Sequence, residues 1–408
     1  MKYGLIGEKL GHSYSKIIHG MLGNSLYELK EIAPEDLDEF MTKKDFLGIN
    51  VTLPYKQAVI PYLDKIDDSA KNIGAVNTVV NRDGRLYGYN TDYYGMKALF
   101  DHAGIDPEGR KAAILGSGAT SRTAKALLTS LGAREINVIS RSNGITYDEL
   151  YAKHSDTEII VNTTPVGMFP DIFGSPIDPT AFKSLVGVID AVYNPLNTDL
   201  ICKAKKRGIN AESGLYMLVA QAIFASELFL DTKYPSYMLD VIYEGIKAEK
   251  ENLVLVGMPS SGKSTVGRLL AEKLGSEFVD TDELIIERIK MPIKDFFSTY
   301  GEEKFRLVES EVINSLAGRN GLVIATGGGS VLREENVSAL KYNGKIIFLD
   351  RSLDKLVTTD SRPLSSDRAS LEGLYNLRYP IYQRVSDLQI PGDGTPGEVA
   401  NNILENYL

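Results

Sequence analysis

The stretch LVLVGMPSSGKSTVGRLL, residues 253–270, joins a short apolar run to a glycine-rich turn and then to a helical pattern. The turn matches the spacing G-x-x-x-x-G-K-S through Gly257, Gly262, Lys263 and Ser264. Glycines at these positions let backbone N–H groups surround phosphate oxygens, while the lysine neutralises developing charge and the serine binds magnesium. Because the turn lies between a strand and a helix, a P-loop is a better interpretation than a chance match in a glycine-rich turn.

Length and composition limit the classes of protein to be considered. A chain of 408 residues predicts two or three domains, at about 150 residues per domain. Hydrophobic residues make up 43% and charged residues 24%, which is typical of globular proteins and excludes a disordered or fibrous chain. The only cysteine, Cys202, excludes an internal disulfide framework and multi-cysteine metal sites. We interpret it as a packing residue in a protein of the reducing cytoplasm.

Export, membrane insertion and nucleic-acid binding are not expected. The N-terminal run MKYGLIGEKLGHS is broken by Glu8 and Lys9, so it does not form the apolar centre of a signal peptide. No stretch approaches the roughly 18 consecutive apolar residues of a membrane span. The net charge of −9 is divided over both halves, and neither half has an excess of basic residues. We expect a cytoplasmic protein whose partners are small molecules, with a homo-oligomer as a further possibility.

Two series of short apolar segments alternate with helical patterns, which is typical of α/β folds with parallel sheets. The first series lies between about 110 and 215 and contains KAAILG, INVIS, EIIVNTT and GVIDAVYN. The second series contains NLVLVG, EFVDTD, LVIATGGG and GKIIFLD. An amphipathic helix, YPSYMLDVIYEGIKAEKEN, ends at a boundary near Asn252 that has almost no Gly/Ser linker. We therefore predict two α/β halves.

Further motifs of the second half narrow the identity of the group that accepts the phosphate. FVDTDELI ends a strand with Asp280 and Asp282, GEEKFRLVESEVI places Arg306 on a helix, and IATGGGSV puts three glycines after a strand. A small polyol acid needs cations for its carboxylate and anionic acceptors for its hydroxyls. Together with SRPL and NLRYPIYQRV, these motifs make residues 253–408 closely resemble shikimate kinase. The resemblance implies a P-loop domain that phosphorylates shikimate with ATP and Mg²⁺.

The resemblance implies how this half binds its substrate. Asp282 would hold ring hydroxyls and orient or deprotonate the accepting one. Arginines would grip the carboxylate, with backbone N–H groups of the glycine run nearby. For Arg306 a solvated ion pair with Glu302 or Glu309 stays open as an alternative. The implied substrate-binding residues are Asp282, Arg306, Gly327, Gly328, Gly329 and Arg378.

The resemblance also implies an ATP and magnesium site. Asp280 would steady magnesium through water beside Ser264, and Arg362 would be a lid arginine that reaches the phosphates as a catalytic group together with Lys263. The family usually stacks an arginine on adenine where this chain has Thr358 and Thr359 in a shortened stretch, which puts that contact in doubt. The implied ATP-binding residues are Gly257, Ser260, Ser261, Gly262, Lys263, Ser264, Thr265, Arg362 and Pro396.

The first half contains a second glycine turn, AAILGSGATSRTAKALL. It places Gly116 and Gly118 between a strand and a helix, as a dinucleotide site requires for close approach of the pyrophosphate to the helix N-terminus. Such a turn alone is as often a plain tight turn, and its third small position is Ser121. After the next strand, Ser140 and Arg141 stand where an NAD enzyme usually carries an acidic residue. An arginine there favours the 2′-phosphate of NADP.

The motifs before and after this turn identify a protein family, which two glycines alone cannot do. GHSYSKIIH, GINVTLPYK, IGAVNTV and GYNTDYYG precede it, and NTTPVGM, DAVYNPLNT and SGLYMLVAQAIFAS follow it. In this order they make nearly all of residues 1–250 resemble shikimate dehydrogenase, which implies NADPH-dependent reduction of 3-dehydroshikimate to shikimate. The implied domains are a substrate-binding domain at 1–100, completed by helices at about 215–250, and a Rossmann-type NADP domain at 101–214.

The resemblance implies a catalytic pair, Lys56 and Asp92. Reduction of a ketone creates an alkoxide, and an ammonium paired with a carboxylate can stabilise that charge and donate the proton. A plain surface lysine is the alternative for Lys56. The implied substrate-binding residues are Ser13, Ser15, Asn50, Thr52, Asn77, Tyr193 and Gln221. The implied NADP-binding residues are Gly116, Gly118, Ala119, Ser121, Ser140, Arg141, Gly214 and Met217.

Two other functions stay open. The first is a quinate/shikimate dehydrogenase in the first half, because quinate differs by one ring hydroxyl and one polar contact decides between them. The second is a non-catalytic regulator that senses metabolites with retained folds. A sensor does not need Lys56, Lys263, Ser264 and Asp282 together, and all four are present. We therefore favour a bifunctional enzyme.

Overall fold

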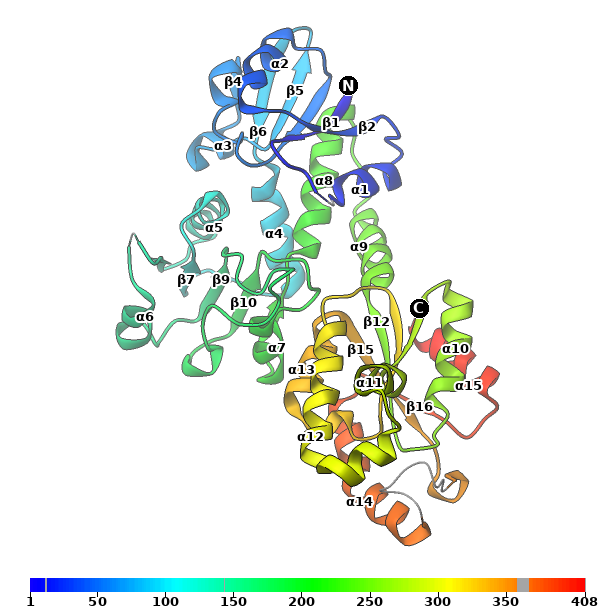
Figure 1. Cartoon of the computed structure of the whole chain (residues 1–408). Helices are drawn as coiled ribbons and strands as arrows, with labels where there is room; N and C mark the ends of the chain where they lie inside the picture. The colour runs from blue at the N-terminus through cyan, green and yellow to red at the C-terminus, as the bar shows by residue number, and fades with distance from the viewer. Residues whose placement is uncertain (12, 143, 358–366, 408) are drawn as a thin grey trace. The chain divides into compact units, whose positions relative to one another are not determined.

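The computed structural model describes residues 1–11, 13–142, 144–357 and 367–407 (Figure 1). It forms two compact units: unit 1 comprises residues 1–194 and 203–246, and unit 2 comprises residues 195–202 and 247–408. The candidate lid residue Arg362, and Thr358 and Thr359 before it, lie outside the described residues. Among the described helices, none is both long and apolar enough to cross a membrane.

The first sheet of unit 1 is mixed, with strand order β2-β1-β3-β5-β6-β4. β1, β2 and β3 pair in parallel, whereas β5 runs antiparallel to β3 and β6. An Asp83-Gly84 turn joins β5 to β6, and both residues have the positive φ that a tight hairpin requires. The strands are β1 (Tyr3–Gly7), β2 (Tyr27–Glu31), β3 (Gly48–Val51), β4 (Lys65–Ile66), β5 (Thr78–Arg82) and β6 (Arg85–Tyr89). The helices between and after them are α1 (Ser15–Met21), α2 (Leu37–Lys43), α3 (Asp68–Ile73) and α4 (Thr91–Ala103).

The second sheet of unit 1 is fully parallel, with strand order β11-β10-β9-β7-β8. The chain leaves β7 toward β8 on one side and later returns to β9 on the other, so strand order reverses at β7. Its strands are β7 (Lys111–Leu115), β8 (Glu135–Ile139), β9 (Ile159–Asn162), β10 (Gly187–Asp190) and β11 (Asn210–Glu212). Its helices are α5 (Ala119–Ser130), α6 (Tyr147–Lys153) and α7 (Asp199–Lys206).

The sheet of unit 2 is also fully parallel, with strand order β13-β14-β12-β15-β16. The four apolar segments expected here form its first four strands, and the predicted α/β class is confirmed in both halves of the chain. The strands are β12 (Asn252–Val256), β13 (Glu277–Asp280), β14 (Leu322–Ala325), β15 (Gly344–Asp350) and β16 (Leu388–Pro391). The helices are α10 (Lys263–Leu274), α11 (Thr281–Ile289), α12 (Ile293–Leu316), α13 (Glu334–Asn343), α14 (Arg368–Val385) and α15 (Pro396–Tyr407).

A helix from late in the first half packs with the first sheet rather than with the second. α8 (Leu215–Leu230) packs along α4, and Phe229 near its end enters an apolar cluster with Leu5, Tyr27 and Val80. α9 (Tyr237–Lys250) follows, as the amphipathic pattern predicted. Figure 1 shows α4 and α8 running alongside each other. Residues more than 100 positions apart in the chain therefore share one helix pair.

A glycine sets the distance between these two helices. A Cβ atom on Gly95 of α4 would lie 2.7 Å from the carbonyl oxygen of Met217 and 3.0 Å from the Cβ of Gln221, both on α8. Backbone atoms cannot yield at such distances, so only glycine permits this approach. The approach brings the first turn of α4, which carries Asp92, beside Gln221.

The substitution Gly95→Ala tests this packing. We expect it to force the helices apart and to lower the free energy of unfolding of unit 1 by about 1–3 kcal/mol, as other overpacked core positions do. The measurement is the thermal unfolding midpoint of the whole chain by calorimetry. Gly245→Ala in α9 is the matched control, because its new Cβ would meet only the Cε of Met21 at 3.5 Å. Equal midpoints for the two variants would contradict the role given to Gly95.

Candidate active sites

Lys56 and Asp92 form a direct ion pair in unit 1. The Nζ of Lys56 lies 2.6 Å from the Oδ2 of Asp92, and the side chains are 18% and 17% exposed. Lys56 lies in the loop after β3, and Asp92 lies in the first turn of α4. Two half-buried charges held this closely are poorly suited to the plain surface position left open for Lys56. An ammonium held against a carboxylate in this way can donate a proton to a substrate oxygen.

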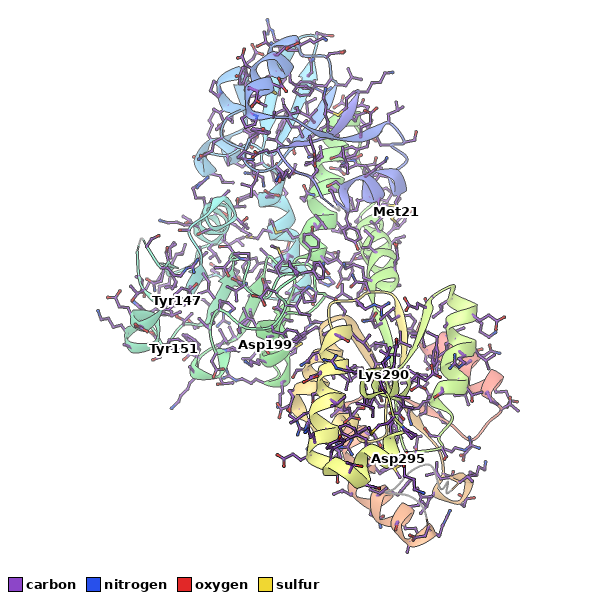
Figure 2. All side chains as sticks on the ribbon, viewed as in Figure 1. Met21, Tyr147, Tyr151, Asp199, Lys290 and Asp295 are labelled. Atoms are coloured by element: carbon purple, nitrogen blue, oxygen red, sulfur yellow. The ribbon has the colours of Figure 1, made fainter. Side chains whose placement is uncertain are left out.

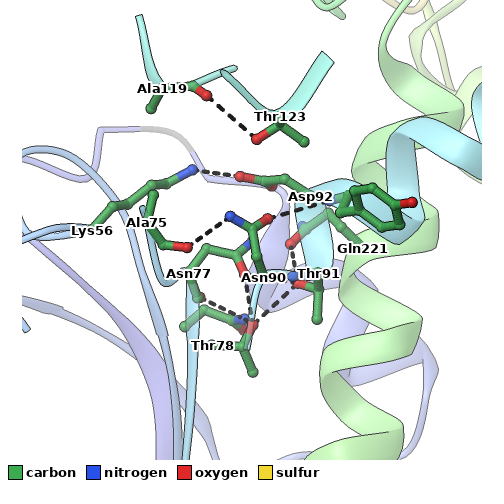
Figure 3. Close-up of polar contacts among 12 residues, drawn as sticks. Lys56, Ala75, Asn77, Thr78, Asn90, Thr91, Asp92, Ala119, Thr123 and Gln221 are labelled. Carbon is green, nitrogen blue, oxygen red and sulfur yellow. Dashed lines mark hydrogen bonds and ion pairs between the residues drawn. The ribbon is translucent and has the colours of Figure 1, made fainter. Parts of the chain in front are cut away.

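A buried network of amides and hydroxyls adjoins this pair (Figure 3). The Oδ1 of Asn77 accepts a hydrogen bond of 2.7 Å from the backbone N–H of Thr91. The hydroxyl of Thr91 lies 3.5 Å from the Oε1 of Gln221, and Thr78 lies 3.1 Å from the same hydroxyl. The network therefore fixes two predicted substrate residues, Asn77 and Gln221, from three separate parts of the chain. Asn90 caps α4 through the N–H of Tyr93 and holds its first turn in place.

The sequence reasoning missed two residues of this network, Thr91 and Tyr27. The Thr91 signal was available, because Asn-Thr-Asp before a helical pattern is an N-cap signature that places Thr91 at the first helical position. Tyr27 gave no such signal. It lies in β2 and donates a hydrogen bond of 2.7 Å to the Oδ1 of Asn50, whose amide donates to Thr78 at 3.0 Å.

His19 supports Tyr27 by stacking. Its ring lies 3.8 Å from that of Tyr27, fully buried, and neither ring nitrogen has a hydrogen-bond partner. Burial lowers the pKa of His19 to about 3, so the imidazole stays neutral and packs as an apolar ring.

The other predicted substrate residues of unit 1 are Ser13, Ser15, Thr52 and Tyr193, and of these Ser15 forms a side-chain hydrogen bond with Tyr27. Ser13 precedes α1 and accepts from the backbone N–H of Ser15, which is buried at the start of that helix. Thr52 follows β3, and its N–H donates to Ile6. Tyr193 follows β10, its ring edge meets Tyr14, and burial raises the pKa of its hydroxyl.

The glycine turn after β7 fits a dinucleotide. Gly116 has φ of +106°, and a Cβ there would lie 2.8 Å from the Oγ1 of Thr163, so only glycine allows this turn. Gly118 caps α5 with ordinary φ, and a Cβ there would meet no protein atom within 4 Å. The glycine therefore leaves open space at the N-terminus of a 12-residue helix, where a pyrophosphate is favoured.

The remaining predicted NADP residues surround this turn. Ala119 opens α5, and Ser121 is buried in its first turn. Ser140 directly follows β8 and donates to the hydroxyl of Ser117 at 3.3 Å, while Arg141 after it is exposed. The first turn of α5 also contacts the part of unit 1 that contains the first sheet. There the Nε of Arg122 donates to the carbonyl of Ile73.

Packing alone explains why residue 214, the N-cap of α8, is a glycine. A Cβ there would lie 2.3 Å from the carbonyl oxygen of Ala191, so the close approach of the β10 loop already requires glycine. Met217 is buried in the first turn of α8, and its carbonyl faces Gly95. Neither position by itself indicates a cofactor contact.

The P-loop of unit 2 follows β12 as predicted. Gly257 has φ of +147°, and a Cβ there would lie 2.8 Å from the carbonyl of Leu349, while Gly262 caps α10 with φ of +93°. The Nζ of Lys263 is buried and donates to the carbonyls of Gly257 and Met258 at 3.0 and 2.9 Å. Lys263 is thus held against the loop that would surround the phosphates.

Ser264 and Asp280 meet at the end of β13. The Oγ of Ser264 donates to the Oδ2 of Asp280 at 2.6 Å, and the Oδ1 of Asp280 caps α11 by accepting from the N–H of Asp282. Hydroxyl and carboxylate oxygens beside a phosphate loop are the ligands Mg²⁺ prefers, and it keeps several waters. The donor set therefore fits magnesium.

Arg306 is buried rather than solvated. Its side chain is 9% exposed, and its Nη1 donates to Glu309 at 2.8 Å while its Nη2 donates to Glu302 at 3.0 Å. Burial opposes the charge of Arg306, but Glu309 and Glu302 outweigh it and raise its pKa. The ion pairs considered from the sequence are present, yet the guanidinium lies inside the protein and not on a solvated helix surface.

The three glycines after β14 are fitted to these side chains. A Cβ on Gly327 would lie 2.8 Å from the Oδ1 of Asp282, and a Cβ on Gly329 would lie 2.3 Å from the Nη1 of Arg306. Gly327 and Gly329 therefore leave room for an aspartate and an arginine against the backbone, and Gly328 leaves room for Pro259. Gly328 accepts a hydrogen bond from the hydroxyl of Tyr382, whose pKa burial raises to about 12.

One cavity of about 940 Å³ brings most of the predicted kinase residues together. Arg378 of α14 lines it as well; this residue is 4% exposed, and its Nε has no hydrogen-bond partner. Asp295 in the first turn of α12, labelled in Figure 2, also lines it. Pro396 is exposed at the start of α15 and does not line it. Gly257 and Ser261 are not among the lining residues, and the predicted residues that line the cavity are Ser260, Gly262, Lys263, Ser264, Thr265, Asp280, Asp282, Arg306, Gly327, Gly328, Gly329 and Arg378.

Comparison with known proteins gives a different match for each half. Residues 5–79 match the family model of the shikimate dehydrogenase substrate-binding domain, and residues 259–407 match that of shikimate kinase. A shikimate dehydrogenase (NADP(+)) of Clostridium perfringens is 36% identical over 266 residues, which cover 60% of this chain and 98% of that protein.

Two solved structures of shikimate dehydrogenases resemble the same share of the chain. That of shikimate dehydrogenase 1 from Peptoclostridium difficile is 38% identical with a TM-score of 0.54, and it covers 60% of this chain and 98% of its own. That of shikimate 5-dehydrogenase from Thermus thermophilus, solved with NADP(H) and shikimate, is 29% identical with a TM-score of 0.54 and covers 60% and 99%.

The buried Arg306–Glu309 pair yields a stability prediction. Glu309 is 1% exposed and also accepts from the hydroxyl of Ser330 at 2.8 Å. Glu309→Gln would leave the Arg306 guanidinium buried without its closest counter-charge, and we expect unit 2 to lose about 2–5 kcal/mol of stability. Urea unfolding of the whole chain measures the loss.

Glu283→Gln is the matched control, since its partner Arg268 and Glu283 itself are both more than half exposed. The exposed pair should change stability by at most about 1 kcal/mol. If Glu309→Gln costs no more than Glu283→Gln, the buried pair does not hold this site together.

Proposed function

This chain belongs to the shikimate dehydrogenase family and contains a shikimate kinase domain at residues 259–407, and we propose that it is a bifunctional enzyme. It reduces 3-dehydroshikimate to shikimate and then phosphorylates shikimate to shikimate 3-phosphate, with NADP(H), ATP and Mg²⁺ as cofactors. The observation that carries the proposal is that one chain holds both sets of reactive groups. The Lys56–Asp92 pair lies in unit 1, and Lys263 with the Ser264–Asp280 pair lies in unit 2.

The packing of the helices supports a division of labour within unit 1. We assign substrate binding to residues 1–100 together with the helices at about 215–250, because α8 packs along α4 and against the first sheet. We assign NADP binding to residues 101–214, where the glycine turn follows β7 at the reversal of strand order. Residues 253–408 form the kinase domain of the proposal.

In the reduction, the carbonyl carbon gains a hydride and the carbonyl oxygen gains a proton. NADPH supplies the hydride when it is bound. Lys56, held at 2.6 Å from Asp92, stabilises the negative charge that develops on the oxygen and donates the proton. Asn77 and Gln221, fixed through Thr91, hydrogen-bond the ring hydroxyls and hold the carbonyl carbon in place.

In the phosphorylation, a ring hydroxyl attacks the terminal phosphorus of ATP and loses its proton, while the bond from that phosphorus to the bridging oxygen breaks and ADP leaves. Asp282, seated against Gly327, orients this hydroxyl and accepts the proton. Lys263 balances the charge of the phosphoryl group that is transferred. Mg²⁺ held by Ser264, and through water by Asp280, would neutralise the phosphate oxygens.

The substrate carboxylate meets the buried arginines of the same cavity. Arg378 has a buried Nε without a partner, so a carboxylate would supply a hydrogen bond that the protein does not. Arg306 is already oriented by Glu309, which leaves part of its donor fork for the substrate. Glu309 therefore positions the guanidinium of Arg306 and still leaves some of its N–H groups for the substrate carboxylate.

Single substitutions should separate the two activities, because they use different residues in different units. Lys56→Ala removes the proton donor, and we expect dehydrogenase kcat to fall at least about 100-fold while phosphorylation of shikimate is unchanged. Lys263→Ala should do the reverse. Initial rates of NADPH oxidation and ADP release on the purified variants measure both.

Lys97→Ala and Lys273→Ala are the controls, since both lysines are exposed on helices of the respective units. Loss of both activities in Lys56→Ala or in Lys263→Ala, with circular dichroism unchanged, would argue against two independent sites. Initial rates of NADP⁺ reduction with shikimate and with quinate determine the substrate preference of the first half.

Arg141 carries the proposed preference for NADP. It is exposed in the loop after β8, and β8 lies next to β7, the strand that the glycine turn follows. Its guanidinium can pair there with a 2′-phosphate. We expect Arg141→Ala to lower the ratio of kcat/KM for NADPH to that for NADH by about tenfold or more. Arg134→Ala, which breaks an exposed pair with Glu158, should leave the ratio unchanged. A ratio unaltered in Arg141→Ala would remove Arg141 from the NADP site.

A further inference from the structure

An arginine that belongs to none of the motifs above lines the kinase cavity. Arg351 directly follows β15, at the same edge of the sheet as the P-loop, because β12 and β15 are parallel neighbours. Its side chain is partly buried and is one of the residues that line the cavity of about 940 Å³. The guanidinium therefore shares the space that contains Lys263, Ser264 and Thr265.

The packing around Arg351 fixes the direction of its side chain. The backbone of Arg351 lies against Gly392 of the loop after β16, since a Cβ on Gly392 would lie 3.4 Å from both the N and the Cβ of Arg351. The Nη1 of Arg351 lies 3.8 Å from where a Cβ on Gly262 would be. The side chain thus extends from the β16 loop to the glycine at which α10 begins.

The guanidinium of Arg351 is incompletely satisfied by the protein. Its Nε is buried without a hydrogen-bond partner, and it forms no ion pair with any residue in the described part of the chain. The neighbouring cations differ: Lys355 lies 3.5 Å from Asp393, and Arg306 is paired with Glu309 and Glu302. A buried charged donor without a partner lowers stability. Its presence beside a phosphate loop therefore points to a ligand that accepts the missing hydrogen bond.

We propose that Arg351 is a nucleotide-binding residue that donates to the phosphates of the nucleotide next to Gly262. The planar fork of a guanidinium matches phosphate oxygens in a bidentate fashion, and the adjacent N–H groups of the P-loop already select phosphate. This inference rests on the proposed kinase function of the same cavity. It adds a cation that approaches the nucleotide from β15, whereas Lys263 approaches from the P-loop itself.

The test uses the full-length chain and three variants: Arg351→Ala, Arg351→Lys and Lys355→Ala. Calorimetric titration gives the Kd of ADP, and competition against ATP gives the inhibition constant of inorganic pyrophosphate, which has phosphates but no base. The KM of shikimate reports whether the rest of the kinase cavity is intact. Lys355→Ala removes the same charge from the same cavity, but from a lysine that is already paired with Asp393.

We expect Arg351→Ala to raise the Kd of ADP and the inhibition constant of pyrophosphate by about tenfold or more, with the KM of shikimate little changed. Arg351→Lys should recover part of the loss, because it restores charge without the fork. Lys355→Ala should change the Kd of ADP by less than about twofold.

Two outcomes would overturn the inference while leaving the kinase function standing. One is an Arg351→Ala chain that phosphorylates shikimate and binds ADP and pyrophosphate as the unaltered chain does. The other is weakened ADP with unchanged pyrophosphate, which would mean that Arg351 contacts the base instead of the phosphates. An unaltered chain that neither binds ADP nor phosphorylates shikimate would instead refute the proposed function itself.

Discussion

Parallel strands force the residues that follow them to one edge of a sheet, and the kinase site depends on this constraint throughout. β12, β13, β14 and β15 are followed in turn by the P-loop, by Asp282, by the glycine run and by Arg351. These segments are spread over about 100 residues of sequence, yet their side chains line one cavity. The second sheet of unit 1 uses the same constraint, since its glycine turn follows β7 where strand order reverses.

In both units, glycines also allow side chains and a neighbouring helix to approach the backbone closely. Gly329 leaves room for the guanidinium of Arg306, and Gly327 leaves room for the carboxylate of Asp282. Gly95 lets α4 approach α8, which places Asp92 and Gln221 in one site. In each case a single added methyl group would displace a reactive or binding side chain, so packing and chemistry cannot be varied separately at these positions.

The sequence predicted the elements that have a local signature. The strand–glycine–helix pattern indicated both glycine turns, and the alternation of apolar segments indicated the parallel sheets. The pairing of Lys56 with Asp92 was expected only through family resemblance, because 36 residues separate them and no local pattern links them. The contact of Tyr27 with Asn50 and the approach of Arg351 to Gly262 were not predicted, since they arise from strand order and from side-chain direction. Burial likewise excludes a solvated ion pair for Arg306, although its sequence neighbourhood also fits one.

The central claim is that one chain performs two consecutive reactions. The most direct measurement is the product formed by the purified chain from 3-dehydroshikimate, with NADPH and ATP supplied together and each omitted in turn. Two separate sites on one chain predict that shikimate accumulates without ATP, that nothing forms without NADPH, and that shikimate 3-phosphate appears when both are present, with one ADP released per NADPH oxidised. Oxidation of NADPH without any release of ADP, at saturating Mg²⁺ and ATP, would contradict the claim.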